Sequence, residues 1–447
     1  MIKKVFNDSI HGLVELHPLL VKIIDTPEFQ RLRNIKQMHG GHFVYPGATH
    51  NRFQHSIGTC YLAVTLGITE EDVLCVEIAA LCHDLGHGPF SHLFDQQFLP
   101  RAWKKEGRGQ HGENTLPKHE DMSIKMLDYL LDKNCLRCSM MEHKLNLPGD
   151  LIFIKDLILG KKEESGERRD KQFLFDIVSN SANGIDVDKW DYFARDCHHL
   201  GIKNNFDYSR LLLSARVCED RKQICYRDKE MSNIYDMFRT RYMLHKRAYQ
   251  HSVCAAIEEM ITDAFLEADE HFQVKGSRGN MFKLSEAITD MEAYSKLTDH
   301  VFEEILYSSD PQLEQARAIL RRIVTRDLYK LVGEGVQAND GDLQACKTAL
   351  TERLGMEMMR DVVVKPADIS YGMKRKINYK FYHKTAPDTA VALMPTASSP
   401  TNPRTFSEKL IRVYIKKSNI RDDVKAAFEE WRHEMGLVEP SVEVEEA

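Results

Sequence analysis

The chain has 447 residues, of which 43% are hydrophobic and 29% charged, a balance typical of a globular protein. Its formal net charge of -6 argues against nucleic-acid binding over the whole surface, although local basic patches fit within that total. No apolar run approaches the roughly 18 residues that a transmembrane helix needs, and the N-terminus does not resemble a signal peptide. We therefore expect a soluble intracellular protein, with no membrane partner. The ten cysteines are scattered, which is typical of reduced thiols.

The predicted elements are mainly helical up to residue 333. The first 16 residues are expected to be extended. Apolar periodicity and capping residues predict helices at 18–25, 27–38, 54–66, 72–84, 119–132, 150–159, 173–180 and 187–199. Two strands are predicted within 211–226. A long helix is predicted from about 231 to 272, and further helices are predicted at 284–293, 299–308 and 310–331.

The sequence changes character near Gly333. After a loop at 335–341, strands are predicted at 361–367, 378–383 and 410–416 and an amphipathic helix at 421–435. A Pro/Ser/Thr-rich loop is expected at 395–403 and a frayed acidic tail at 439–446. The predicted fold class is therefore mainly α, with a helical core over residues 1–333 and a small α+β C-terminal lobe over residues 334–447.

Potential metal ligands are concentrated in one short stretch, which contains His83, Asp84, His87 and His92. It follows an apolar run that predicts a buried helix, and two glycines and a proline end that helix, so His83 and Asp84 are expected at a buried helix end. An adjacent His-Asp pair supplies one nitrogen and one oxygen ligand, which alone do not make a site. His55 and Asp188 lie on other predicted helices. The four residues form a mixed nitrogen and oxygen set suited to iron, manganese or zinc.

Helical spacing groups further polar side chains. Asp188, Tyr192 and Asp196 lie four residues apart and share one helix face, whereas Asp191 and Arg195 are spaced for an ion pair on another face. In the long predicted helix, Arg241, His245 and Tyr249 repeat the same spacing, which is equally typical of a solvated stripe.

The ordered set His55, His83-Asp84 and Asp188 resembles that of the HD metal-dependent phosphohydrolase superfamily. A closer resemblance is carried by Tyr45-Pro-Gly-Ala-Thr-His-Asn-Arg-Phe-Gln-His55 and by 82–92, 184–201 and 249–251. These stretches are similar to the vertebrate deoxynucleoside triphosphate triphosphohydrolases that join a SAM domain to an HD domain. The resemblance covers nearly the whole chain and is weakest over 333–399. The chain begins where the catalytic core of that family begins, so the SAM domain is expected to be absent.

The resemblance implies hydrolysis of a dNTP to a deoxynucleoside and inorganic triphosphate. A water activated by the metal would attack the α-phosphorus, and His92 would protonate the departing 5′ oxygen. The acid and its relay residues would be His87, His92, Asp95 and His119. We expect His92 to be the acid because an imidazole near its ordinary pKa can donate a proton at neutral pH.

The resemblance also implies a substrate pocket. The triphosphate would be held by Arg52, His87, His92, Lys189, Tyr192 and Arg241, and the deoxyribose by Gln37, Tyr192 and Asp196. Gln250 would face the base edge, Met38 would stand beside the sugar where the family has leucine, and Tyr249 would crowd the 2′ position and so reject ribonucleotides. Mg²⁺ would accompany the nucleotide phosphates.

Regulation is implied in the same way, through a homotetramer assembled by GTP and dNTP activators. The GTP site would comprise Lys4, Val5, Asp25, Gln30 and Arg33. The adjoining dNTP site would comprise Asn7, Val44, Tyr45, Asp207, Arg210, Arg227, Lys229, Asn233, Arg247, His251 and Lys416. Ser252 replaces a lysine of the family and Tyr45 a phenylalanine, which weakens the expected activator binding. A nuclear location, limitation of cellular dNTP pools and a role in antiviral innate immunity are further implications of the resemblance.

Two other functions stay open at this point. One is an HD phosphodiesterase or nucleotidase acting on other nucleotides, which the many phosphate-directed groups do not favour. The other is a single-stranded nucleic-acid-binding protein with a structural metal site, for which the basic stretch 239–247 is the candidate surface. Cys135 and Cys138 have the spacing of a zinc site without further ligands. Cys218 and Cys225 flank the predicted hairpin and are expected to be free thiols, with pairing under oxidation as the alternative.

Overall fold

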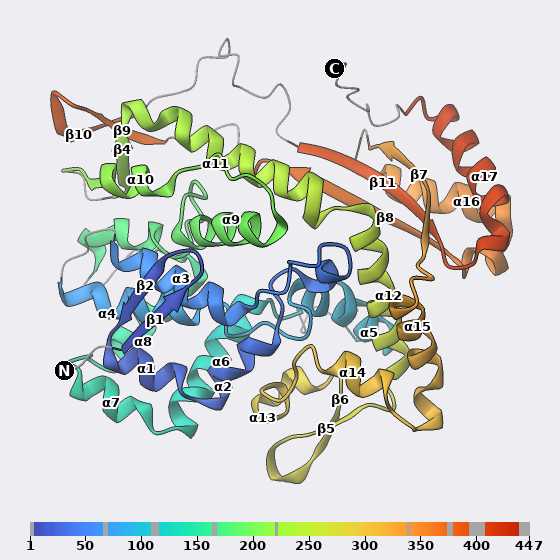
Figure 1. The fold of residues 1–447 in the computed structure, drawn as a ribbon, viewed down its shortest axis with the longest axis horizontal. Helices are drawn as coiled ribbons and strands as arrows, with labels where there is room; N and C mark the ends of the chain where they lie inside the picture. Colours follow the sequence, from blue (N-terminus) through green and yellow to red (C-terminus); the bar gives the residue numbers. More distant parts are fainter. Residues whose placement is uncertain are drawn as a thin grey trace.

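The computed structural model describes residues 4–65, 70–108, 116–162, 168–219, 222–337, 339, 341–372, 379–392 and 407–437. The loop predicted at 395–403 and the acidic tail predicted at 439–446 lie outside the described residues. Within them the fold is mainly α with a few small sheets, as predicted (Figure 1). No helix in these ranges is both long and apolar enough to cross a bilayer.

The chain opens with an antiparallel hairpin of β1 (Lys4–Asp8) and β2 (Gly12–Leu16), which confirms the predicted extended start. Helix α1 (Pro18–Ile24) follows, capped by the His17 ring, which accepts from the Leu19 N–H. Helix α2 (Pro27–Gln30) is shorter than the predicted helix 27–38. It tightens into a 3-10 turn and ends at Ile35, whose backbone is extended.

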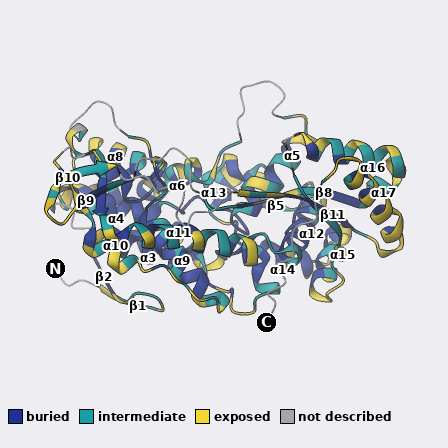
Figure 2. Cartoon of the chain, turned by 90° about the horizontal axis from the view of Figure 1, so that it is seen from above, coloured by how far each residue is buried: buried dark blue, intermediate teal, exposed yellow. Residues whose placement is uncertain are grey.

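The core around the predicted ligands is helical. It contains α3 (Arg52–Thr65), α4 (Glu70–Cys82), α6 (His119–Lys133), α8 (Gly149–Leu159) and α9 (Val187–Leu200), all close to their predicted bounds. The buried residues run continuously through these helices, which bury their apolar faces against one another (Figure 2). The helix predicted at 173–180 is wrong, because a 3-10 stretch occupies 169–176.

Shorter elements connect and flank this core. They are α5 (Leu99–Lys105), α7 (Leu136–Glu142), α10 (Tyr208–Ser214), α13 (Met291–Tyr294), α14 (Val301–Leu306) and the hairpin of β5 (Gln273–Lys275) and β6 (Met281–Lys283). The helix predicted at 284–293 is thereby reduced to α13 and a preceding 3-10 turn, because Asp290 is extended and caps α13 through its side chain.

The long helix predicted from 231 to 272 is broken in the structure. Helix α11 (Met231–Leu244) continues as one π-helical turn to Tyr249, and α12 (Ser252–Ala268) then starts in a new direction (Figure 1). The break occurs at His251, whose backbone is extended and whose ring accepts from the Val253 N–H, so that it caps α12. Helix α15 (Glu314–Val324) packs along α12 and ends seven residues before the predicted end of its helix at 331.

Helix α15 ends early because the chain then enters strand β7 (Lys330–Val336) of a C-terminal sheet. Strand β7 pairs with β11 (Ser407–Ile415), which also pairs with β8 (Val362–Ser370), and both pairings are antiparallel. Helices α16 (Asp342–Met359) and α17 (Arg421–Glu434) pack against this sheet around their own apolar cluster. Strand β7 and helix α16 are absent from the prediction, which has a loop at 335–341.

A second sheet joins the lobe to the core. Its order is β10 (Ala386–Ala392), β9 (Lys380–His383), β4 (Ile224–Arg227) and β3 (Arg216–Val217), with β9 parallel to β4. The boundary predicted at residue 333 falls inside β7, and the division into two domains therefore stays a prediction. Cys218, which follows β3, and Cys225, which lies in β4, are both buried, and no disulfide joins them.

Candidate active site and metal centre

The four predicted metal ligands converge from three helices. His55 lies on α3, His83 and Asp84 follow α4, and Asp188 lies in the first turn of α9. His55 Nε2 is 3.0 Å from an Asp188 oxygen and 3.5 Å from an Asp84 oxygen. His83 Nε2 is 3.5 Å from an oxygen of each of these two carboxylates. The arrangement therefore directs two imidazole nitrogens and two carboxylates at one point.

This donor set fits a divalent cation. The His83 Nε2 atom is buried and makes no hydrogen bond among the described residues, which is the state of a nitrogen aimed at a missing partner. Burial lowers the pKa of His55, but hydrogen bonds to Asp188 and Asp191 outweigh it and raise that pKa to about 10. Burial raises the pKa of Asp188, but the two imidazoles outweigh it and hold that pKa below its ordinary value. The carboxylates thus favour a positive charge between them, which a metal ion supplies.

A carboxylate behind the centre fixes the orientation of His55. The Asp191 side chain is fully buried and accepts from His55 Nδ1 at 2.7 Å, from His11 Nε2 at 2.6 Å and from Arg195 at 2.8 and 2.9 Å. Because an ionised carboxylate only accepts, Nδ1 of His55 carries the proton and Nε2 is left for the cation. Arg195 also pairs with Asp8 at 3.0 Å, so the first hairpin is tied to this network.

Three further histidines form a compact group beside the metal centre. The His87 and His119 rings are stacked with centroids 4.2 Å apart, and the His92 ring lies 4.8 Å from each of them. Asp95 lies 3.3 Å from His119 Nδ1 and 3.8 Å from His92 Nδ1. The structure thus brings together the four residues predicted as acid and relay.

The expectation that His92 has an ordinary pKa is wrong for the free chain. Burial and the neighbouring His87, His119 and Arg52 groups lower the pKa of His92 well below its usual value. Burial is the largest of these causes, and it exists only after the chain has folded, so the residue order around His92 does not reveal it. Burial also lowers the pKa of His119, but the hydrogen bond to Asp95 outweighs it and raises that pKa.

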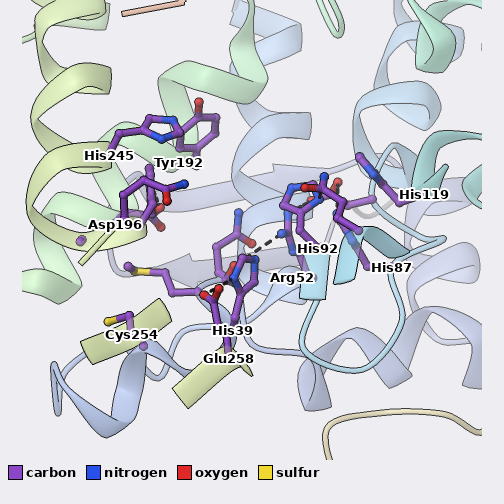
Figure 3. A pocket seen from close by; sticks show the side chains of 18 of the residues that line it. His39, Arg52, His87, His92, His119, Tyr192, Asp196, His245, Cys254 and Glu258 are labelled. Carbon is purple, nitrogen blue, oxygen red and sulfur yellow. Dashed lines mark hydrogen bonds and ion pairs between the residues drawn. The ribbon is translucent and has the colours of Figure 1, made fainter. Parts of the chain in front are cut away.

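A cavity of about 480 Å³ opens next to both groups (Figure 3). Predicted residues that line it are Gln37, Met38, Arg52, Asp84, His87, His92, His119, Asp188, Tyr192, Asp196, Arg241, Tyr249 and Gln250. His39, Gln96, Gln97, His245, Cys254 and Glu258 also line it and are absent from the predicted site. The cavity wall therefore includes Asp188, Tyr192 and Asp196 of α9 and also Arg241, His245 and Tyr249, so the latter three are not a solvated stripe.

Several side chains of the predicted pocket are held by other protein groups. Lys189 is not among the lining residues, because its ammonium pairs with Asp186 at 2.9 Å. Asp196 accepts from the Tyr249 hydroxyl at 2.5 Å, and its other oxygen lies 2.6 Å from His50 Nε2. A ligand that uses Lys189 or Asp196 must therefore compete with these contacts.

The comparisons with known proteins point to one family. The HD domain family matches residues 52–196, which contain all four predicted ligands. The deoxynucleoside triphosphate triphosphohydrolase SAMHD1 of Danio rerio is 50% identical, over 98% of this chain and 75% of its own length. The Homo sapiens protein of the same name is 47% identical over 98% of this chain and 74% of its own. A homolog from Dictyostelium discoideum is 36% identical over 95% and 80%.

The chain belongs to the SAMHD1 family. The matched HD segment begins at Arg52, which donates to the predicted metal ligand Asp84 at 2.6 Å, and ends at Asp196, which accepts from Tyr249 in the cavity wall. The HD family implies a divalent metal, and His55, His83 and Asp84 lie close enough together to hold one, without fixing which metal it is.

The residues predicted for the GTP site lie together. Lys4 Nζ is 3.7 Å from an Asp25 carboxylate oxygen, Gln30 donates to the carbonyl of the residue before Asp25 at 2.8 Å, and Arg33 donates to Gln30 at 2.8 Å. Val5 is half exposed on the same hairpin. These side chains form a polar surface next to the start of the chain.

The residues predicted for the dNTP activator site do not form one site within the chain. Asn233 donates to the Asp207 carbonyl at 2.8 Å near the start of α11, and Arg210, Arg227 and Lys229 belong to the same region. A second group of these residues lies around Tyr45, whose hydroxyl donates to the Arg247 carbonyl. Val44 and His251 are next to Tyr45. Lys416 follows β11 and pairs with Asp263 of α12, and Asn7 lies on β1. Helices α12 and α10 lie on opposite sides of the view in Figure 1.

Proposed function

We propose that this chain hydrolyses deoxynucleoside triphosphates to a deoxynucleoside and inorganic triphosphate. The observation that carries the proposal is the position of the four-ligand centre, which opens directly into the cavity. One part of that cavity holds Arg52 and the histidine group, and another holds Tyr249 and Asp196. This arrangement suits an anionic group at the metal and a sugar beyond it. The relatives named above are triphosphohydrolases by name, and their similarity extends over nearly the whole chain.

In the proposed mechanism His55, His83, Asp84 and Asp188 hold the catalytic cation. We infer iron, manganese or zinc from the two nitrogen and two carboxylate donors, with Mg²⁺ accompanying the nucleotide phosphates. The bound cation supplies Lewis acidity that neutralises charge on a phosphoryl oxygen. Arg52 keeps Asp84 ionised and adds a fixed positive charge at the same end of the cavity.

His92 is proposed to donate a proton to the departing 5′ oxygen. Its low pKa in the free chain reflects burial and surrounding cations, and a bound triphosphate opposes the effect of those cations because its negative charge stabilises an imidazolium. Asp95 then faces both His92 and His119 and can stabilise whichever ring is charged. His87 lies between Asp84, which is 3.2 Å from its Nε2 atom, and the rings of His92 and His119. We propose that His87 binds phosphate together with Arg241 and Lys189.

Recognition of deoxyribose is assigned to the part of the cavity that holds Tyr249 and Asp196. The Tyr249 ring is fixed by its hydroxyl bond to Asp196, so a ribose 2′ hydroxyl meets a wall that cannot easily move. Gln37 and Tyr192 complete the sugar site with Asp196, Met38 packs beside the sugar, and Gln250 faces the base edge. This pocket distinguishes sugars more strongly than bases.

The test is product analysis. The pure protein is incubated with dGTP, Mg²⁺ and a transition metal, and the products are separated by ion exchange. Deoxyguanosine and triphosphate in equal amounts are expected. Pyrophosphate or dGMP contradicts the proposal and favours a phosphodiesterase or nucleotidase of the same superfamily.

We also propose activation by GTP and dNTPs through a homotetramer. Support comes from the polar surface around Lys4 and Asp25 and from the dNTP set, whose members lie in separate regions of one chain, as is expected if different chains complete the site. Light scattering with and without GTP and dATP tests this, and an unchanged mass contradicts it. The Ser252→Lys variant, which restores the family cation, is expected to need less activator.

A nuclear location, control of cellular dNTP pools and a part in antiviral immunity are proposed from family membership alone. Single-stranded nucleic-acid binding is not proposed as the main function. In the basic stretch 239–247, the aromatic ring of Tyr242 stacks on Tyr371 with centroids 4.4 Å apart, so that face is occupied.

A further inference from the structure

His39 lines the catalytic cavity in a backbone conformation that is unusual for a residue with a side chain. Its φ is +48°, in the left-handed region. That conformation costs about 1–2 kcal/mol for a residue with a Cβ, and it persists only where the surroundings hold it. Neither the HD ligand set nor the predicted substrate pocket includes His39.

The contacts of His39 explain how the ring is held. Its Nδ1 is 3.0 Å from Oε1 of Glu258 on α12, and the other Glu258 oxygen accepts from Gln97 at 3.0 Å. Burial raises the pKa of Glu258, but the hydrogen bond from His39 outweighs it and lowers that pKa, so the carboxylate is ionised and accepts. Nδ1 therefore carries a proton. The other ring nitrogen, Nε2, makes no hydrogen bond within the described ranges.

His39 faces the phosphate end of the cavity. Its ring centroid is 5.8 Å from that of His92, with the two planes at 87°. Figure 3 shows His39 and Glu258 between Cys254 and the group of His92, His87 and His119. A phosphoryl group that accepts a hydrogen bond of about 2.8 Å on each of two oxygens fits between imidazoles at this separation.

We propose that His39, oriented by Glu258, is a further substrate-binding residue that contacts the α-phosphate of the nucleotide beside His92. The inference rests on the proposed dNTP hydrolysis, because His92 marks the α-phosphate only in that reaction. It adds to the cavity the pair of His39 and Glu258, which the predicted pocket lacks.

The variant His39→Gly separates binding from folding. Glycine adopts φ +48° without strain, so the melting temperature is expected to stay the same or rise. The value of kcat/KM should fall about tenfold to a hundredfold, the effect of losing a hydrogen bond to a charged group, and by a similar factor for all four dNTPs. Equilibrium binding of the α,β-imido analogue of dGTP should weaken. Glu258→Gln, which keeps an acceptor oxygen, should give a smaller loss.

Arg278→Gly is the matched control. Arg278 also has a positive φ, of +56°, but it is exposed between β5 and β6 and does not line the cavity. It should leave kcat/KM unchanged. Wild-type kinetics and analogue binding for His39→Gly overturn the inference, and a loss confined to one base moves His39 to the nucleobase and also overturns it. Absence of triphosphate release by the wild-type protein overturns the proposed function instead.

Discussion

Replacing Asp191 by Asn tests the link between the buried network and the metal centre most directly. Each Asp191 oxygen accepts two hydrogen bonds, one from Arg195 and one from a histidine, His11 or His55. An amide has only one acceptor oxygen, so its NH₂ group must point at two donors in either orientation. If the NH₂ group faces His55, Nδ1 must become the acceptor and the proton moves to Nε2, the atom that faces the cation.

Asp191→Asn is expected to lower two quantities, the free energy of unfolding and the affinity for the metal. Losing one member of a buried ion pair costs about 3–5 kcal/mol, and because Arg195 keeps Asp8 at 3.0 Å we expect the lower end, about 3 kcal/mol. Loss of the carboxylate that orients a metal-binding histidine weakens metal affinity about tenfold to a hundredfold. Neither effect requires contact between Asp191 and the substrate.

The assay has two parts. Urea unfolding of the metal-free protein measures stability, and titration of Mn²⁺ or Zn²⁺ against a chelator measures affinity. Glu304→Gln, an exposed carboxylate on α14, is the matched control and should change neither quantity. If Asp191→Asn has the wild-type unfolding midpoint and the wild-type metal affinity, the reasoning about this network is refuted.

Three more predictions follow from the described contacts. Asp188→Ala should lose bound metal, measured by elemental analysis, while circular dichroism stays that of a folded protein; full metal content would remove Asp188 from the ligand set. Burial raises the pKa of Glu259, but Arg101 and Lys365 outweigh it and lower that pKa to about 2. The ionised Glu259 carboxylate therefore stabilises the folded protein at any pH above the ordinary pKa of a glutamate, and this stabilisation is lost as the pH falls toward 2. Glu259→Gln should therefore destabilise the protein by about 3 kcal/mol at pH 7 and progressively less below pH ~4.5, and a pH-independent difference in urea unfolding would contradict this. Tyr249→Ala should raise GTP hydrolysis relative to dGTP hydrolysis about tenfold or more, measured as released triphosphate, and an unchanged ratio would show that the ring does not exclude the 2′ hydroxyl.

Local signals in the sequence predicted much of the helical core. Capping residues and apolar periodicity are properties of short segments, and for this reason α3, α4, α6, α8, α9 and α17 lie near their predicted bounds. The break between α11 and α12 was missed because the apolar pattern continues through it and only the extended backbone of His251 interrupts the helix. Strand β7 was missed because its two glycines resemble a loop until it pairs with β11.

The sequence by itself singled out His55, His83, Asp84 and Asp188 as the predicted ligand set, because their types and order match the HD pattern, and the structure brings their side chains together. Only the tertiary structure decided which other groups join them. His11 reaches Asp191 across 180 positions, and His39 pairs with Glu258 across 219; no local pattern connects residues so far apart. The low pKa of His92 has the same origin, since burial and the convergence of charges from separate elements exist only after the chain has folded.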